Sequence, residues 1–305
     1  MSSARILDGK ALAEALLSSI RVKVEQMRSK AGRAPGLAVI LAGEDPASKV
    51  YVGNKSRAAR KCGFEVFDFK FPSGASLEEI RAAVQKCNAD SLVDGILVQL
   101  PLPKGMDSEA LLCLIHPAKD ADGLHPLNQG LLLRGRPGVR PCTPLGVMAL
   151  LDLAFAPQDL SFGSELFPAC DLSGKQAVVI GRSLLVGKPL SLMLLERNAT
   201  VSVAHSKTTD LPAVCRQADV LIAAVGVPEL VKKEWIKPGA VVIDVGINRL
   251  ESGERAGKLV GDVEFEAACQ VASAISPVPG GVGPLTVAML MHNTCSAWLR
   301  HAALA

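Results

Sequence analysis

The chain contains few aromatic residues and carries little net charge. Aromatic side chains make up 4% of its 305 residues, with a single tyrosine, Tyr51, and the formal net charge is +3. Proteins that bind nucleic acid usually combine clustered lysine and arginine with aromatic side chains on which bases stack. The sequence has no block of basic residues and few stacking groups, so we do not expect a nucleic-acid partner.

Long apolar runs and closely spaced cysteines are also lacking. No 18 consecutive residues are apolar, and the opening MSSARILDGKALAEALL lacks the continuous apolar segment of a signal peptide. The closest two of the eight cysteines, Cys62 and Cys87, are 25 residues apart, which excludes the CxxC spacing of zinc knuckles and redox pairs. We therefore expect a cytoplasmic protein with reduced thiols, no membrane partner and no bound metal.

Length and hydrophobic pattern predict two α/β domains. A chain of 305 residues exceeds what one hydrophobic core usually supports. Apolar runs that resemble strands alternate with helical patterns, which is typical of mostly parallel sheets covered by helices. The expected strands form two series, at 36–44, 64–71 and 93–100, and then at 176–181, 200–205, 220–226 and 240–246.

A break near residues 145–172 separates the two series. We place the domain boundary so that residues 1–149, completed by 284–305, form the first domain and 150–283 form the second. The C-terminal helix is then expected to pack back on the first domain.

The segment VVIGRSLLVGKP, residues 178–189, has the setting of a dinucleotide-binding loop. It follows an expected strand and opens an expected helix, as a Rossmann fingerprint requires. Gly181 would permit the tight turn and Gly187 the close approach of helix and strand, while Ser183 replaces the usual middle glycine. Amides at the helix N-terminus can hold a pyrophosphate, with Ser183 assisting. A glycine turn without a ligand is the alternative, but the surrounding strands favour a dinucleotide.

The end of the next strand favours NADP over NAD. NAD-binding proteins usually place Asp or Glu there, to accept a hydrogen bond from the ribose 2′-OH. Here the strand ends in His205, Ser206 and Lys207, and Arg182 lies in the preceding loop. Hydroxyl and cationic donors suit a 2′-phosphate, although a solvated basic loop would explain Lys207 equally well.

A lysine interrupts an apolar helix face in the first domain. One face of the helix expected over residues 47–62 carries Tyr51, Lys55, Ala58, Ala59 and Cys62. A lysine in such a stripe either extends its amine to water or is held out of water. In the second case it releases its proton more readily than a solvated lysine and can transfer protons.

Two further polar residues stand near the ends of expected elements. Gln99 lies at the carboxyl end of the strand GILVQL, where α/β sheets present groups to ligands. Asp122 lies in the loop KDADGLHP. Neither residue indicates a site by itself.

Together these segments resemble a known enzyme family. The chain contains, in order, YVGNK, VQLPLP, KDADGLHPLN, PCTPLGV, GRSLLVGKP, HSKT, VIDVGINR, GDV and PVPGGVGPLTVAML. From about Asp8 to the C-terminal helix it closely resembles the bifunctional methylenetetrahydrofolate dehydrogenase/methenyltetrahydrofolate cyclohydrolase (FolD) family. The main departure is a longer segment around 155–170.

The resemblance implies a two-step folate enzyme of one-carbon metabolism, with a link to purine biosynthesis. With NADP it would oxidise 5,10-methylene-tetrahydrofolate to the methenyl cation, and it would then hydrolyse that cation to 10-formyl-tetrahydrofolate. The implied fold is α/β, with a small N-terminal catalytic domain and a Rossmann-like NADP-binding domain. A homodimer is implied as well.

The resemblance also assigns roles to individual residues. Lys55 is the implied catalytic lysine, supported by Tyr51 and Gln99, and Asp122 is the implied pterin-binding carboxylate. The remaining folate contacts fall on Val98, Leu100, Pro279, Gly280, Gly281, Val282 and Gly283. Cofactor contacts fall on Gly181, Arg182, Ser183, Ser206 and Ile247. No metal is implied.

Two other functions use a similar architecture. Shikimate dehydrogenase and its relatives also join a small α/β domain to an NADP domain, but they would need a lysine–aspartate catalytic pair and a more glycine-rich loop. A noncatalytic NADP-binding sensor would have lost one of the four polar residues of the first domain. Tyr51, Lys55, Gln99 and Asp122 are all present.

Overall fold

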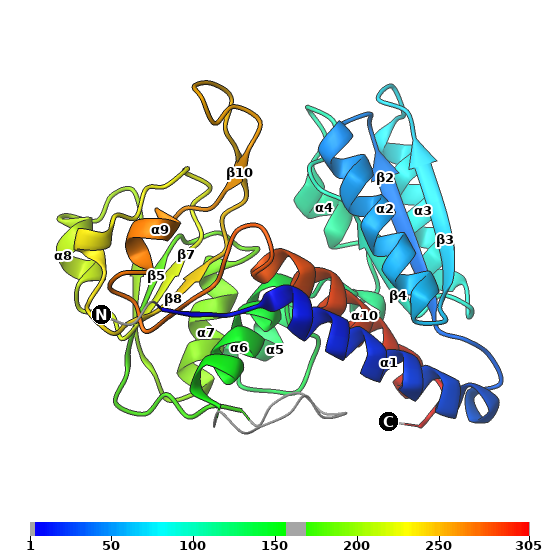
Figure 1. Ribbon diagram of the computed structural model, residues 1–305. Helices are drawn as coiled ribbons and strands as arrows, with labels where there is room; N and C mark the ends of the chain where they lie inside the picture. Colours follow the sequence, from blue (N-terminus) through cyan, green and yellow to red (C-terminus); the bar gives the residue numbers. More distant parts are fainter. Residues whose placement is uncertain (1–3, 157–168, 305) are drawn as a thin grey trace. The chain divides into compact units, whose positions relative to one another are not determined.

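The computed structural model describes residues 4–156 and 169–304 and divides into two compact units, each built on a parallel sheet (Figure 1). The three-stranded unit comprises residues 15–142 and 287–305, and the six-stranded unit comprises residues 1–14 and 143–286. The predicted α/β fold class is therefore confirmed. The domain boundary at residues 149 and 150 stays a prediction, and most of the lengthened segment around 155–170 lies outside the described residues.

The three-stranded sheet has the order β3–β2–β4, and its strands are β2 (Gly36–Ala42), β3 (Glu65–Phe71) and β4 (Gly95–Val98). Every residue of β2 and β4 is buried, as expected for parallel strands covered on both faces. The edge strand β3 contains no fully buried residue. The first predicted series of strands is confirmed.

Local sequence signals mark where several helices of this unit begin. The helices are α1 (Gly9–Ala31), α2 (Pro46–Lys61), α3 (Leu77–Ala89), α4 (Ser108–Leu112), η1 (Pro117–Lys119) and α5 (Pro126–Leu133). The Asp45 side chain accepts from the Ser48 N–H at the start of α2, and Ser76 and Glu79 form a capping box on α3. These caps satisfy amides that have no partner within the helix.

The C-terminal helix α10 (Val282–His301) packs on the three-stranded unit from residue 287 onward. The side-chain amide of Asn293 donates to the carbonyls of Ala121 and Arg140, both at 3.0 Å. The side chain of Thr294 lies so close to Gly95 that a Cβ there would approach it within 3.0 Å. The predicted return of this helix to the first domain is confirmed.

The six-stranded sheet has the order β1–β11–β8–β7–β5–β6, and all its strands are parallel. They are β1 (Arg5–Ile6), β5 (Gln176–Ile180), β6 (Thr200–Ala204), β7 (Val220–Ala223), β8 (Val241–Asp244) and β11 (Ala274–Ile275). The second predicted series is confirmed. Sequence patterning missed β1 and β11, because two residues are too few to show a strand period.

The connections of this sheet create a switch point between β5 and β7. From β5 the chain passes to β6 at one edge, and it then returns to β7 on the other side of β5. The register aligns Ile180, Ala223 and Asp244 across β5, β7 and β8. Their loops therefore begin at the same level, at the sheet edge where dinucleotides bind in such folds.

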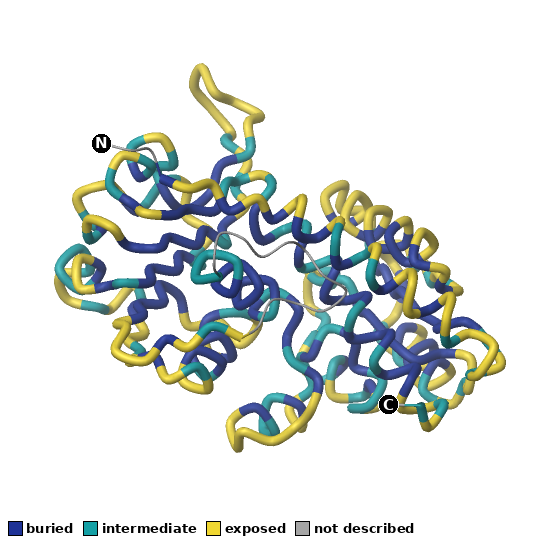
Figure 2. Tube along the Cα trace, turned by 60° about the horizontal axis from the view of Figure 1, so that its bottom comes forward, coloured by how far each residue is buried: buried dark blue, intermediate teal, exposed yellow. Residues whose placement is uncertain are grey.

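The remaining elements of the six-stranded unit surround this sheet. They are α6 (Cys142–Phe155), α7 (Gly187–Glu196), α8 (Leu211–Cys215), η2 (Lys233–Trp235), α9 (Phe265–Ala268) and the hairpin of β9 (Asn248–Arg249) with β10 (Leu259–Val260). Figure 2 shows the central strands buried and the tip of this hairpin exposed. No helix within the described residues is both long and apolar enough to span a bilayer.

Candidate functional site

Lys55 lies on the buried face of α2. Only 7% of its surface is exposed, and Val52, Ala58 and Ala59 of the same helix are buried beside it. A lysine that extended its amine to water would be far more exposed. Of the two alternatives left open by the sequence, the structure supports the lysine held out of water.

Gln99 is the partner of this lysine. It follows β4, and the Lys55 Nζ donates to its Oε1 at 3.1 Å. The Gln99 Nε2 donates to the Leu100 carbonyl at 2.6 Å, which turns the side-chain oxygen toward the amine. Val98, the last residue of β4 and the neighbour of Gln99 in the chain, is buried. The structure therefore brings Lys55, Gln99, Val98 and Leu100 to one carboxyl end of the sheet.

Asp120 shapes the loop that carries Asp122. Its Oδ1 accepts from the backbone N–H groups of Gly123 and Leu124, both at 3.1 Å, and its Oδ2 accepts from His125 N at 2.8 Å and from Asn128 Nδ2 at 2.8 Å. Burial raises the pKa of Asp120, and these hydrogen bonds oppose the rise. Sequence reasoning missed this residue, because DADG offers two aspartates and only the contacts separate a loop-forming carboxylate from an available one.

The charges of two predicted site residues influence the thiol of Cys142. Burial raises the pKa of Cys142 well above its ordinary value; the charge of Asp122 adds to the rise and that of Lys55 opposes it. Both charges must therefore be near this sulfur. The N–H of Cys142 also donates to the Asp122 carbonyl at 3.3 Å. Lys55 and Asp122, 67 positions apart in the sequence, thus both act electrostatically on the Cys142 thiol.

Tyr51 stands one turn before Lys55 on α2 and is 39% exposed. Within the described part of the chain, no hydrogen bond joins its hydroxyl to the lysine amine. The phenol is therefore available at the surface beside a buried amine.

The predicted phosphate loop, residues 181–187, has the geometry that its glycines suggested. Gly181 follows β5 with φ +122°, and a Cβ there would collide with the Ala224 carbonyl. A Cβ at Gly187 would collide with the backbone of Gly181, so helix α7 and strand β5 approach closely. The Ser183 hydroxyl accepts from the Val186 N–H at 3.1 Å, at the start of α7. Arg182 is exposed beside it.

The loop after β6 presents donors on a short turn. The N–H of Lys207 donates to His205 Nδ1 at 3.1 Å, and the N–H of His205 donates to Thr208 Oγ1 at 2.9 Å. Ser206 and Lys207 are both exposed on this turn. The loop leaves the same edge of the sheet as Arg182, because β5 and β6 are paired up to Ile180 and Ala204.

Ile247 meets the glycine-rich loop that follows β11. It leaves β8 with 43% of its surface exposed, and a Cβ at Gly283 would approach its Cδ1 within 3.3 Å. In that loop Gly280 has φ +108°, and its carbonyl accepts from the Lys10 N–H at 2.9 Å. Pro279 to Gly283 therefore share one edge of the six-stranded sheet with the predicted cofactor residues.

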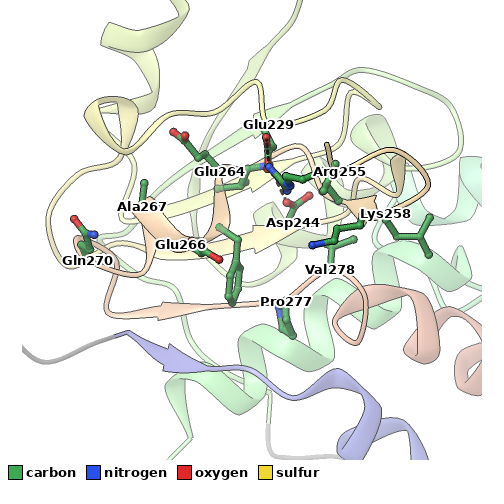
Figure 3. Close-up of a pocket in the computed structure, with 15 residues that line it drawn as sticks. Glu229, Asp244, Arg255, Lys258, Glu264, Glu266, Ala267, Gln270, Pro277 and Val278 are labelled. Carbon is green, nitrogen blue, oxygen red and sulfur yellow. Dashed lines mark hydrogen bonds and ion pairs between the residues drawn. The ribbon is translucent and has the colours of Figure 1, made fainter. Parts of the chain in front are cut away.

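A cavity of about 610 Å³ lies elsewhere in the six-stranded unit, below the β9–β10 hairpin (Figure 3). Its lining includes Asp244, Arg255 and Glu229, and Arg255 Nη2 pairs with Glu229 Oε1 at 2.8 Å. None of the predicted cofactor residues lines it. Because this cavity is not at the switch point between β5 and β7, we do not place the site there.

Metal-ligating side chains do not gather in the part of the chain that the structure describes, where no group of three or more His, Cys, Asp or Glu is suitably arranged. All eight cysteines are free thiols, and only Cys113 is exposed.

Two family models match the chain. Residues 7–122 match the tetrahydrofolate dehydrogenase/cyclohydrolase catalytic domain, and residues 141–302 match the NAD(P)-binding domain of the same family. The Bifunctional protein FolD of Sphingopyxis alaskensis is 51% identical over 304 residues, which covers 99% of this chain and 96% of that protein.

Solved structures give the same result. The bifunctional enzyme FolD of Campylobacter jejuni superposes with a TM-score of 0.89 at 44% identity, over 98% of this chain and 99% of that one. The Trypanosoma brucei FolD, solved with NADP and an inhibitor, has a TM-score of 0.89 at 39% identity and the same coverage. A shikimate 5-dehydrogenase from Thermus thermophilus reaches only 15% identity and a TM-score of 0.50, a likeness of fold alone.

Proposed function

Because the chain belongs to the tetrahydrofolate dehydrogenase/cyclohydrolase family, we propose that it is a bifunctional, NADP-dependent enzyme of folate one-carbon metabolism. It oxidises 5,10-methylene-tetrahydrofolate to the 5,10-methenyl cation and hydrolyses that cation to 10-formyl-tetrahydrofolate, a formyl donor suited to purine biosynthesis. The observation that carries the proposal is the buried Lys55–Gln99 pair, whose Nζ and Oε1 are 3.1 Å apart. The charges of Lys55 and Asp122 both act on the Cys142 thiol, which supports the same assignment.

The residues at the carboxyl edge of the six-stranded sheet fit NADP. Side chains at Gly181 and Gly187 would collide with backbone, so the turn can be this tight only with glycine. The start of α7 offers amides for a pyrophosphate, and Arg182, Ser206 and Lys207 are exposed donors for a 2′-phosphate. A bound NADP would supply the hydride acceptor for the oxidation of the folate methylene carbon.

The oxidation requires alignment of the folate carbon with the nicotinamide more than it requires a base. The hydride leaves the carbon with both electrons, so no side chain has to remove a proton in that step. Asp122 would accept hydrogen bonds from the adjacent N–H groups of the pterin edge, with Asp120 holding its loop. Pro279, Gly280, Gly281, Val282 and Gly283 would line the folate pocket, and Ile247 would contact the cofactor.

Hydrolysis of the methenyl cation requires a proton acceptor and then a donor. Water attacks the methenyl carbon and loses a proton to the Lys55 amine. The carbon–N5 bond then breaks, the lysine returns its proton to N5, and loss of the remaining hydroxyl proton forms the formyl carbonyl. Gln99 would orient the amine through its Oε1. Tyr51, one helical turn away, would support the lysine on its solvent-exposed side.

A single set of assays tests the proposal. The purified protein is expected to form NADPH from methylene-tetrahydrofolate and, in a separate reaction without NADP, to accelerate loss of the methenyl cation. Absence of both activities would refute the proposed function. NADP-dependent oxidation of shikimate instead would favour the alternative enzyme, and NADP binding without turnover would favour a sensor.

We further infer a homodimer, supported by the exposed edge of the six-stranded sheet. Strand β6 is last in the sheet order, and Val203 on it is 42% exposed. Edge strands with apolar side chains favour contact with another chain. Sedimentation at micromolar concentration is expected to give twice the chain mass of 31.9 kDa. A species of the chain mass would contradict the inference.

The free thiols suit the reducing cytoplasm, where we place the enzyme.

A further inference from the structure

Two buried aspartates, Asp244 and Asp262, connect the loops at the cofactor edge of the six-stranded sheet. Asp262 is fully buried, and Asp244 is nearly so. Asp244 belongs to the motif VIDVG and Asp262 to the motif GDV. The proposed function assigns no role to either carboxylate.

The Asp262 carboxylate accepts four hydrogen bonds. Its Oδ2 accepts from the backbone N–H groups of Val225 at 2.7 Å and Gly226 at 3.0 Å. Its Oδ1 accepts from the Val227 N–H at 3.0 Å and from Asn248 Nδ2 at 2.9 Å. Residues 225–227 form the loop after β7, so one side chain ties this loop to the start of the hairpin.

Asp244 holds Asp262 in place. It is the last residue of β8, and its Oδ1 accepts from the N–H groups of Gly246 at 3.0 Å and Asp262 at 2.9 Å. Its Oδ2 accepts from the Val263 N–H at 2.8 Å. The pair therefore links the loops after β7, β8 and β10 through a continuous chain of hydrogen bonds.

Each aspartate packs against the glycine of the other motif. A Cβ at Gly246 would collide with the Asp262 carboxylate, and a Cβ at Gly261 would collide with the Asp244 carboxylate. Both motifs therefore combine one aspartate with one glycine for a steric reason, since the carboxylates could not reach their amides past a larger residue.

The order of the strands indicates which half of a dinucleotide these loops face. In the order β8–β7–β5–β6, the phosphate loop follows β5 and the 2′-phosphate residues follow β6. A dinucleotide along this edge therefore places its nicotinamide half over the loops after β7 and β8. On those loops, Val227 and Ile247 are 44% and 43% exposed.

We propose that Asp262, held by Asp244, is the positioning residue for the nicotinamide half of NADP. It sets the position of the loops after β7 and β8 without touching the cofactor, because its oxygens are directed at protein N–H groups. The inference rests on the proposed NADP site. It implies that the aspartate pair serves the oxidation, which needs an aligned nicotinamide, and not the hydrolysis, which needs none.

The two activities of one chain provide the test. In Asp262→Asn, the side-chain NH₂ group cannot accept hydrogen bonds from the backbone N–H groups. The loop after β7 therefore loses hydrogen bonds that fix its position. Dehydrogenase kcat is expected to fall by about 10- to 100-fold, the loss typical of a small misplacement of reacting groups. Cyclohydrolase activity on the methenyl cation should stay unchanged. The calorimetric affinity for 2′,5′-ADP, a probe of the adenosine half alone, should also stay unchanged.

Asp219→Asn is the matched control. Asp219 lies at the amino end of β7, where its carboxylate accepts from the Gln176 N–H at 2.8 Å and the Lys237 Nζ at 2.6 Å. This variant is expected to lower stability without separating the two activities. Parallel loss of both activities in Asp262→Asn, or an unchanged dehydrogenase, would overturn the inference.

A second variant covers a failure of Asp262→Asn to fold. Asn248→Ala removes one of the four donors to Asp262 and is expected to lower dehydrogenase kcat by a few-fold while sparing the cyclohydrolase. If Asn248→Ala retains the same fraction of the wild-type activity in both reactions, the inference is overturned. A wild-type protein without NADP-dependent oxidation would instead reject the proposed function, and this inference with it.

Discussion

At the scale of single residues, burial separates Lys55 from the other lysines of its helix. Lys55 has an apolar face around it and one side-chain partner, the Gln99 oxygen at 3.1 Å. Lys61, at the end of the same helix, is exposed. A lysine amine that is held in one position can act as the proton acceptor and donor that the proposed hydrolysis requires.

Lys55→Gln is expected to remove most of the cyclohydrolase activity. The variant keeps a side chain of similar polarity but has no group that can accept and return a proton, so we expect a loss of about 10²- to 10⁴-fold. Dehydrogenase activity should fall less, because hydride transfer needs no proton acceptor. Both activities are measured beside Lys61→Gln, which should match wild type. Cyclohydrolase activity close to wild type in Lys55→Gln would show that this lysine is not the proton acceptor.

The Asp244 carboxyl gives the stability of the protein a pH dependence of defined sign. Burial raises its pKa to about 7 and the charge of Asp262 adds to the rise, while three backbone hydrogen bonds oppose it. An aspartate in the unfolded chain titrates near 3.9, so between about pH 4 and pH 7 the folded state holds a proton that the unfolded state has lost. Stability from this group is therefore present at low pH and is lost as pH rises through 7.

Comparing wild type with Asp244→Asn tests this sign. Between pH 5 and pH 7, the free energy of unfolding of wild type is expected to fall relative to the variant by up to about 1.4 kcal/mol per pH unit. Urea denaturation at several pH values measures both slopes. Parallel slopes would mean that Asp244 is already ionised in the folded protein at pH 5.

At the scale of elements, the last turn of α10 is joined to the amino end of the three-stranded sheet. Asp94, just before β4, is fully buried and accepts from the Arg33 guanidinium at 2.6 and 2.7 Å and from the Gly36 N–H at 2.8 Å. The Nδ1 of His301 lies 2.9 Å from the same carboxylate. This cluster is at the opposite end of the strands from Lys55 and Gln99, so we assign it to stability.

Asp94→Ala is expected to destabilise the protein by about 3–5 kcal/mol, because it leaves a partly buried guanidinium without its counter-charge. Glu25→Ala is the matched control, since Glu25 pairs with Arg21 at 2.9 Å on an exposed helix surface and such pairs contribute about 0–1 kcal/mol. Urea denaturation gives both values. A loss in Asp94→Ala no larger than in Glu25→Ala would contradict a structural role for the cluster.

At the scale of the whole molecule, the two units carry different parts of the proposed chemistry. The three-stranded unit contains Lys55, Gln99 and Asp122, which the proposal assigns to proton transfer and pterin binding, and the six-stranded unit contains the residues that it assigns to NADP. The proposal therefore assigns the choice between NADP and NAD to the six-stranded unit. Around Arg182, Ser206 and Lys207, the strand end has hydroxyl and cationic side chains where an acidic residue would select NAD.

Arg182→Ala is expected to raise the KM for NADP far more than the KM for NAD. Loss of a hydrogen bond to a charged phosphate corresponds to a change of about ten- to a hundredfold in affinity. Lys175→Ala serves as the control, because Lys175 is exposed just before β5 at the opposite edge of the sheet. Equal kcat/KM values for the two cofactors in wild type would contradict the predicted NADP preference.

Local patterns in the chain were sufficient to predict most of the architecture. Strands such as β2 and β5 are runs of adjacent apolar residues, and the turn at Gly181 needs a residue without a side chain. Such signals lie within a few neighbouring residues, so they are visible before the chain is folded. The same holds for the ordered motifs that carry the family resemblance. The two-residue strands β1 and β11 were missed, because their pairing depends on segments far apart in the chain.

The folded arrangement of the chain decided the rest. Asp120 and Asp122 look alike in DADG, and only the folded loop directs the Asp120 carboxylate to its four donors. Asp262 reaches Val225 across 37 positions, and Asn293 reaches Ala121 across 172. Burial likewise made Lys55 a solvent-excluded amine instead of a surface charge. A hydrogen bond or a desolvated charge depends on which segments meet in space, and that information belongs to the tertiary structure because no local period encodes it.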